Sequence, residues 1–212
     1  MNYTELVDAI QDYTQNDEAV FVSQIPTMVK MAEKRIFDQT QLLVARKNVT
    51  STTTISVPYI QAPTDFLAPY SMALIVSGTH YPLVITDETF MREVYPTAAT
   101  TGQPVHYALF DNNTFLLGPT PDSSSYSVEL HYFFYPTSIV DASTSWLGTN
   151  AEHALLYGCL VEAYRFMKGE ADVMQSVEAT YQTALNGLKM LSAARDRGDA
   201  YRYGQFKVEV QA

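Results

Sequence analysis

The residues of this sequence with the widest chemical range are its histidines, since imidazole binds metals and exchanges protons near neutral pH. They are His80, His106, His131 and His153. His106 and His131 lie in two runs expected to form strands that could pair, but no third ligand stands at metal-site spacing beside them. Histidines on the strands of an aromatic sheet are usually structural. The sequence therefore predicts no metal site.

Carboxylates are common in this acidic chain, but their spacing indicates no catalytic pair. Glu152 and Glu162 lie too far apart on one expected helix to act together. The sequence lacks a nucleophile elbow, a glycine-rich phosphate loop and a His-Glu-x-x-His helix. Asp111-Asn-Asn-Thr114 begins like a calcium loop but lacks the later Gly and Glu, which favours a hairpin turn. We therefore predict no catalytic, cofactor-binding or metal-binding residue and no enzyme.

Composition limits the classes of partner. The 212 residues carry a formal net charge of −10, which disfavours electrostatic binding of nucleic acid. Hydrophobic residues make up 47% and charged residues 17%, with 15 Tyr and 10 Phe. Two interpretations fit this aromatic-rich, charge-poor chain equally well: burial against partner subunits, or a tyrosine-rich β core.

The expected compartment follows from three further features. The single cysteine, Cys159, excludes an internal disulfide and is typical of a small buried hydrophobe in a reducing environment. Met1–Glu5 shows no basic region leading into an apolar core, so no secretory signal is expected. No apolar run approaches the length of a membrane span. We expect a cytosolic product.

Four stretches predict helices at the two ends of the chain. Residues 2–13 place apolar side chains on one stripe, with Asn2 and Glu5 at capping-box spacing. A second helix is expected from a cap at Ser23, with Pro26 in its first turn, to about Gln41. A third is expected over 154–168, with Thr149 and Glu152 as its capping box and Gly169 as its stop, and a fourth over 171–195.

Residues 42–147 predict a β-rich module. Branched and Ser/Thr-rich runs over 42–57 favour edge strands, and 72–85 predicts a hairpin around Ser77–His80. A short helix with an acidic start is expected over 87–94. Strands over 104–110, 115–122 and 126–136 are expected to form an antiparallel meander, and the only tryptophan, Trp146, marks the junction with the helices.

These elements predict an α+β fold, a four-helix bundle-like α domain with an inserted antiparallel β module. The predicted helical domain comprises 1–41 and 148–196, and the β module 42–147. Residues 197–212 are expected to form an extended C-terminal tail, either frayed or docked on a partner. Phe206, Val208 and Val210 alternate in it as in a strand added to a partner.

Several runs, in their order along the chain, carry a resemblance to a known family. They are Asn2–Ile10, Asp65–Tyr70, Tyr107–Asp111, Leu117–Asp122, Glu129–Tyr135, Ser145–Asn150, Ala154–Tyr164 and Phe166–Glu170. In this order the chain resembles the head-to-tail adaptor proteins of short-tailed bacteriophages over nearly its full length, most closely from Ser145 to Glu170. The matching motifs are structural rather than catalytic.

The resemblance implies a structural virion protein. Such an adaptor forms a ring, usually dodecameric, beneath the portal in the neck between capsid and tail, after assembly in the host cytoplasm. The ring extends the DNA channel, where an acidic lumen would let DNA slide without sequence-specific contact. By this analogy Tyr201, Arg202, Tyr203 and Phe206 dock onto the portal protein. The helices then form the ring contacts, and the β module meets the tail tube or nozzle protein.

Two alternatives from other classes remain at this point. One is a monomeric β-rich recognition module, which could bind carbohydrate through tyrosines and Trp146. The other is a hydrolase whose carboxylate pair the sequence does not place. Both predict isolated protomers, whereas the adaptor predicts a ring stacked on the portal.

Overall fold

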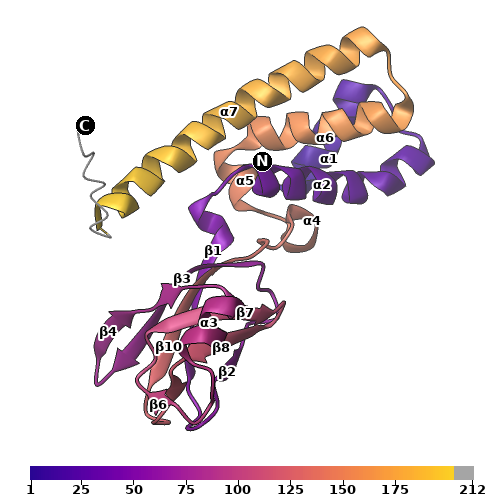
Figure 1. Cartoon of the computed structure of the whole chain (residues 1–212). Coiled ribbons are helices and arrows are strands. Elements are labelled where there is room, and N and C mark those ends of the chain that lie inside the picture. The colour runs from indigo at the N-terminus through magenta and orange to yellow at the C-terminus, as the bar shows by residue number, and fades with distance from the viewer. Residues whose placement is uncertain (203–212) are drawn as a thin grey trace. The chain divides into compact units, whose positions relative to one another are not determined.

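The computed structural model describes the backbone of residues 1–202 and the side chains of residues 1–193. The described chain forms two compact units, one from Met1–Ala45 with the chain after Pro136, the other from Arg46–Tyr135 (Figure 1). The first unit is helical and the second holds the sheets. The predicted α+β class is confirmed.

The N-terminal helix α1, Tyr3–Thr14, begins with the predicted capping box. The Asn2 side chain accepts a hydrogen bond from the Glu5 amide at 3.0 Å, and the Glu5 carboxylate accepts one from the Asn2 amide at 2.9 Å. These two bonds satisfy amide groups that a helix start otherwise leaves unpaired. Leu6 and Ile10 on its apolar stripe are fully buried.

Helix α2, Ala19–Gln39, begins earlier than the sequence predicted. The Ser23 hydroxyl donates to the Val20 carbonyl at 2.8 Å, inside the helix, so Ser23 is not a cap. Pro26 accordingly lies beyond the first turn. The apolar face buries Phe21, Ile25 and Met28, among others, and this packing outweighs the local preference for a later start.

Two short helices follow the β unit, α4 (Ile139–Ala142) and α5 (Trp146–Asn150). The predicted capping box at Thr149 and Glu152 is wrong, because Thr149 lies inside α5 and its hydroxyl donates to the Ser145 carbonyl at 3.1 Å. Ser145 is the cap of α5, since its hydroxyl accepts from the Gly148 amide at 3.1 Å. Trp146 packs partly against the helical core, so it does not mark the edge of the β unit, which ends at Tyr135.

Helix α6, Glu152–Met167, lies at the centre of the helical unit, where α1, α2 and α5 all pack against it. Most of its residues are buried, as expected of a helix covered on several sides. It ends at Lys168, whose φ of 56° is left-handed and turns the chain just before Gly169. At Gly158 a Cβ atom would stand 3.2 Å from the Tyr181 ring and 3.4 Å from Ala32, so glycine lets the neighbouring helices approach closely.

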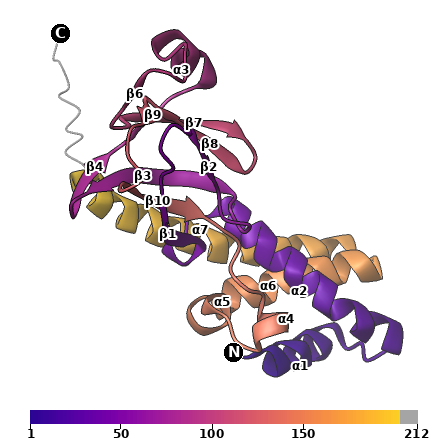
Figure 2. The same ribbon diagram turned by 90° about the horizontal axis from the view of Figure 1, so that it is seen from below.

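The last helix, α7, covers Ala171–Arg202 and lies antiparallel to α6 (Figures 1 and 2). It buries Tyr181, Leu185 and Leu188. The predicted end at Arg195 is wrong, because the helix continues for two further turns. Gly198 costs a helix interior only about 1 kcal/mol, which the helix formers around it can offset. Residues 197–202 of the predicted extended tail therefore belong to α7. Residues 203–212 lie outside the described residues.

The β unit contains two four-stranded sheets and one two-stranded sheet. The first sheet has the order β1 (Arg46–Thr52), β10 (Ser127–Phe133), β3 (Ala68–Val76) and β4 (Thr79–Pro82), all antiparallel. The second has the order β2 (Tyr59–Gln61), β8 (Thr114–Gly118), β7 (His106–Asp111) and β5 (Val84–Ile85). The small sheet pairs β6 (Thr101–Gly102) with β9 (Thr120–Pro121).

The strand predictions hold in part. The hairpin around Ser77–His80 is confirmed for β3 and β4, as are the edge position of β1 and the β7–β8 hairpin. Val84 and Ile85 instead pair with β7 in the second sheet, and residues 53–57 form no strand. The third strand of the predicted meander is wrong, because β10 pairs with β1 and β3 in the other sheet. Pro119 and Pro121 cannot donate to a ladder, so the chain leaves the second sheet after β8.

The core of the β unit lies between its two large sheets. Met72 and Leu74 of β3 and Val128 and Leu130 of β10 pack with residues of β7 and β8. The short helix α3, Glu88–Val94, has the predicted acidic start, since the Asp87 side chain accepts from the Phe90 amide at 2.7 Å. Its Met91 packs on Ala108 and Leu116 of the second sheet.

Candidate functional site

The four histidines do not gather at one point, although two of them share a partner. His106 lies on β7, and its Nδ1 atom is 2.8 Å from the Tyr95 hydroxyl. The Nε2 atoms of His80 and His131 lie 3.5 Å and 3.6 Å from carboxylate oxygens of Glu129. His106 and His131 lie in different sheets, so the strands that carry them do not pair. Among the residues that the structure describes, no three potential ligands gather around a metal position.

The two carboxylates on α6 serve ion pairs. The buried Glu162 pairs with Arg35 of α2 and lies 3.5 Å from Arg165 of its own helix. This pair ties α2 to the central helix. The thiol of Cys159 is fully buried nearby, and burial raises its pKa, which keeps it protonated and unreactive.

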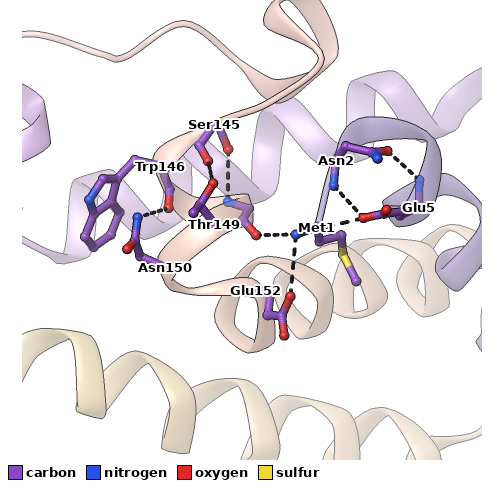
Figure 3. A network of polar contacts seen from close by, with 9 residues as sticks. Met1, Asn2, Glu5, Ser145, Trp146, Thr149, Asn150 and Glu152 are labelled. Atoms are coloured by element: carbon purple, nitrogen blue, oxygen red, sulfur yellow. Dashed lines mark hydrogen bonds and ion pairs between the residues drawn. The ribbon is translucent and has the colours of Figure 1, made fainter.

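Glu152 belongs to a polar network at the start of the chain (Figure 3). The Met1 ammonium donates to the Gly148 carbonyl at 2.7 Å and lies 3.6 Å from Glu152. Figure 3 shows Met1, which precedes α1, in contact with the end of α5 and the start of α6. The network joins the N-terminus to the helices that follow the β unit.

A buried carboxyl group fixes α4 to α2. Glu33 is 5% exposed, and its Oε1 atom accepts from the Ile139 amide at 3.0 Å. Burial raises the pKa of Glu33, against the lowering effect of its hydrogen bonds from Ser138 and Ile139. Nearby, Lys30 and Asp141 form an exposed ion pair at 3.0 Å.

A stacked cluster lies where the chain enters and leaves the β unit. The Arg46 guanidinium lies 4.0 Å from the ring centre of Tyr70 and 5.2 Å from that of Phe133. Arg46 and Phe133 are also partners in the β1–β10 ladder. Cation–π stacking at this position holds the first and last strands of the unit together.

The helical unit has an open groove between α6 and α7. It encloses about 500 Å³ and is lined by His153, Tyr157, Ala179, Thr180, Thr183 and Ala184. The rings of His153 and Tyr157 stack at 6.3 Å, and the edge of Tyr13 from α1 meets Tyr157 at 6.4 Å. The groove therefore has an aromatic floor on α6 and a wall of small side chains on α7.

A second exposed apolar surface lies on α2. Val20 is 68% exposed and Met31 is 54% exposed. Thr27 lies between them on the same side of the helix, and the exposed polar residues Ser23 and Gln24 lie between Val20 and Thr27. We call this surface the α2 ridge, and the surface between α6 and α7 the α6–α7 groove.

The sequence prediction did not identify either surface. Of the four residues proposed for portal docking, Tyr201 and Arg202 form the end of the α7 backbone. Tyr203 and Phe206 lie outside the described residues. The pattern of α7 contained a signal for the groove: from Val173 to Gly187 the only charged residue is Glu178, which pairs with Arg165 of α6.

The fold and these surfaces indicate a general class of protein. The histidines and α6 carboxylates serve packing and ion pairs, while exposed apolar faces on ordered helices suit binding to other chains. No helix in the described part of the chain is long and apolar enough to cross a membrane. These features are those of a structural, partner-binding protein.

Comparison with known families agrees with this class. The SU10 adaptor protein family matches residues 1–207, and the chain belongs to this family of bacteriophage adaptor proteins. The resemblance to head-to-tail adaptors is confirmed. No curated protein matches the chain.

Proposed function

We propose that the protein forms a ring, dodecameric in the virion, that joins the portal to the tail and extends the DNA channel. The observation that carries this proposal is the family match over residues 1–207. The division of the chain into two compact units supports the proposal, because each unit can meet a different partner. In this arrangement the helical unit forms the ring and the β unit meets the tail tube or nozzle in the virion neck.

The portal contact is assigned to the C-terminal residues Tyr201, Arg202, Tyr203 and Phe206. Aromatic side chains and Arg are the residues that most often dominate binding energy at interfaces. A further support is position, since the α7 backbone continues to Arg202, beyond Leu188, the last core residue of the helical unit among the described side chains. Assembly is proposed to take place in the host cytoplasm.

The channel is proposed to be acidic. A formal charge of −10 on each copy adds up around a ring, and like charge keeps DNA from adhering to the wall. Replacing several exposed acidic residues with Lys should slow DNA ejection. Unchanged ejection by such variants would remove this part of the proposal.

The test mixes the full chain with portal rings from the same phage and images the product. The expected result is a second ring stacked on the portal. Substitution of Tyr201, Arg202, Tyr203 and Phe206 by Ala should abolish binding while leaving circular dichroism and thermal unfolding unchanged. Isolated protomers beside bare portal rings would contradict the adaptor function, and full binding by the Ala variant would contradict the docking assignment.

A further inference from the structure

Strand β1 is the longest of the four strands at the edges of the two large sheets. The other three have two to four residues, and β4 ends in a proline, as is usual for edges that take up no further chain. β1 has seven residues, no proline and an unbroken register with β10. Its two cations are engaged, since the Arg46 guanidinium stacks on an aromatic ring and Lys47 lies 2.7 Å from Asp65. The five residues that follow, Asn48–Thr52, are exposed and uncharged.

The backbone of this edge is directed away from its own sheet at every second residue. The Thr53 amide donates to the Tyr126 carbonyl at 3.0 Å, which continues the ladder between β1 and β10. Residues two apart in an antiparallel ladder have the same orientation, so the odd-numbered residues of β1 bond to β10 as Thr53 does. Three even-numbered residues direct their amide and carbonyl groups outward, where no strand pairs in the part of the chain that the structure describes: Asn48, Thr50 and Thr52. These groups can hold an added strand by main-chain hydrogen bonds.

An apolar cavity opens beside this edge, between β1 and β2. It has a volume of about 220 Å³, and four core residues of the β unit line it: Met72, Phe115, Val128 and Leu130. Val49 and Ser51 of β1 also line the cavity and are exposed, although their ladder partners are buried. A strand added to β1 would cover both residues and direct every second side chain toward the cavity. The occupant must therefore be extended and apolar at alternate positions.

No charged residue lines this cavity in the part of the chain that the structure describes. Residues 48–64, which include both β1 and β2 edge positions, contain no acidic residue, basic residue or histidine, although charged residues make up 17% of the chain. Four large apolar side chains of this segment are exposed: Val49, Ile55, Val57 and Tyr59. The charges that flank the segment, Lys47 and Asp65, pair with each other. Loss of charge in this way is typical of the centre of an interface.

The end of the same chain has the pattern that this site requires. Ten residues, 203–212, follow the described part of α7, and in them Val208 and Val210 alternate with Lys207, Glu209 and Gln211. Residues 207–211 are as many as the five exposed residues of β1, and as a strand they would have one apolar and one polar side. The two valine side chains together hold six carbon atoms, as many as benzene, which a cavity of about 150 Å³ accommodates.

The charges of this segment fall on the outer side of an added strand. There Lys207 and Glu209 lie beside the uncharged residues of the β1 edge and face solvent. One acidic group of the sheet is on the same side, Glu129 of β10, opposite Thr50 in the ladder. It lies two strand spacings from the added strand, about 10 Å, where salt screens its repulsion of Glu209.

We propose that residues 207–211 of one copy add as a strand to the β1 edge of the neighbouring copy, with Val208 and Val210 in its cavity. This inference rests on the proposed ring, to which it adds a contact between neighbours. The α7 backbone continues for about 21 Å beyond Leu188, the last core residue among the described side chains, so the segment begins away from its own helical core. The contact joins two different surfaces of one chain, so it is heterologous and repeats around a ring.

Disulfide trapping in full-length chains tests this contact. One protein carries Val208→Cys and a second carries Val49→Cys or Ser51→Cys, and the two are mixed with portal rings under mild oxidation. A link between the two proteins is expected at one of the two β1 positions, because opposite side chains lie closest where the pair shares no hydrogen bond. The native Cys159 is fully buried and does not compete.

The control for trapping is Thr50→Cys, whose thiol lies on the outer side of β1 and should not link to Val208→Cys. Two results overturn the proposal. One is the absence of a link at both Val49→Cys and Ser51→Cys. The other is a link that forms only when both cysteines are placed in the same chain, because the segment then covers the edge of its own copy.

Charge at the two valine positions should weaken association between copies. The valine variant, Val208→Asp with Val210→Asp, should associate on portal rings at least about tenfold more weakly than wild type in sedimentation, a difference of about 1.4 kcal/mol. The matched control, Gln205→Asp with Gln211→Asp, adds the same charges to the polar side of the segment and should associate as wild type does. Wild-type association by the valine variant, or equal weakening by both variants, overturns the proposal.

Portal binding by single copies separates this contact from the adaptor function. Portal docking is assigned to residues up to Phe206, so the valine variant should still bind the portal. If it binds and its copies also associate as wild type does, the adaptor function stands and the strand contact is wrong. If wild-type chains do not bind the portal at all, the adaptor function itself is contradicted.

Discussion

At the scale of residues, Glu33 shows how burial changes the chemistry of one side chain. Its carboxyl group accepts a backbone hydrogen bond from Ile139, yet burial raises its pKa above the ordinary 4.5. The folded protein therefore binds this proton more tightly than the unfolded chain does. The stabilising contribution is complete below pH 4.5 and is lost as the pH rises through the raised pKa.

Replacing Glu33 with Gln should remove this pH dependence. Gln keeps an oxygen acceptor for the Ile139 amide and carries no charge at any pH. We expect urea unfolding to show wild type and Glu33→Gln diverging above pH 4.5, with the variant the more stable at pH 8. Glu33→Ala should cost about 1–3 kcal/mol at every pH, because the Ile139 amide then lacks its partner.

The control for this experiment is Glu93→Gln, at an exposed position on α3. It should keep the wild-type pH profile. If Glu33→Gln and wild type lose stability in parallel from pH 5 to pH 8, the carboxyl group of Glu33 is not the source of the dependence.

At the scale of elements, two serines show that a serine near the start of a helix is not always its N-terminal cap. Ser145 caps α5 through its contact with the Gly148 amide, whereas Ser23 lies inside α2. Ser145→Ala should therefore destabilise the protein by about 1 kcal/mol. Ser23→Ala should be neutral or slightly stabilising, because Ala is the better residue in a helix interior. Chemical unfolding of both variants measures the difference, and equal losses would contradict the assignment of the cap.

The same contrast shows what local sequence can predict. The α1 capping box and the Asp87 cap were predictable because every partner lies within four residues along the chain. The start of α2 was not, since Phe21 must be buried against residues from the far end of the chain, including Phe166. The β10 strand was recognisable from its alternation, but its partners β1 and β3 depend on contacts that no local pattern records.

The candidate site was less predictable than the fold. Composition fitted burial against partners and a tyrosine-rich β core equally well, so the class of the protein came from the family resemblance. The groove needs His153 and Tyr157 on one helix to face Thr180 and Thr183 on another. Periodicity predicted both helices, but the side of α6 left open depends on where α1, α2 and α7 pack.

At the scale of the whole molecule, the chain passes between its units at two neighbouring points. Arg46 begins the β unit, and its ladder partner Phe133 lies just before the end of that unit at Tyr135. The helical core contains residues before Ala45 and after Pro136, from Leu6 to Leu188, and none of the β unit. The helical unit therefore closes its core without the sheets.

Replacing residues 46–135 with a short Gly/Ser linker should leave the helical unit folded, since the two connection points lie on paired strands. We expect a helical circular dichroism spectrum, cooperative thermal unfolding and retained portal binding, with loss of tail attachment. Deleting only 59–121 provides the control: it leaves Val128, Leu130 and Tyr132 without the residues that bury them, so this chain should aggregate. Non-cooperative unfolding of the 46–135 replacement would show that the helical core depends on the β unit.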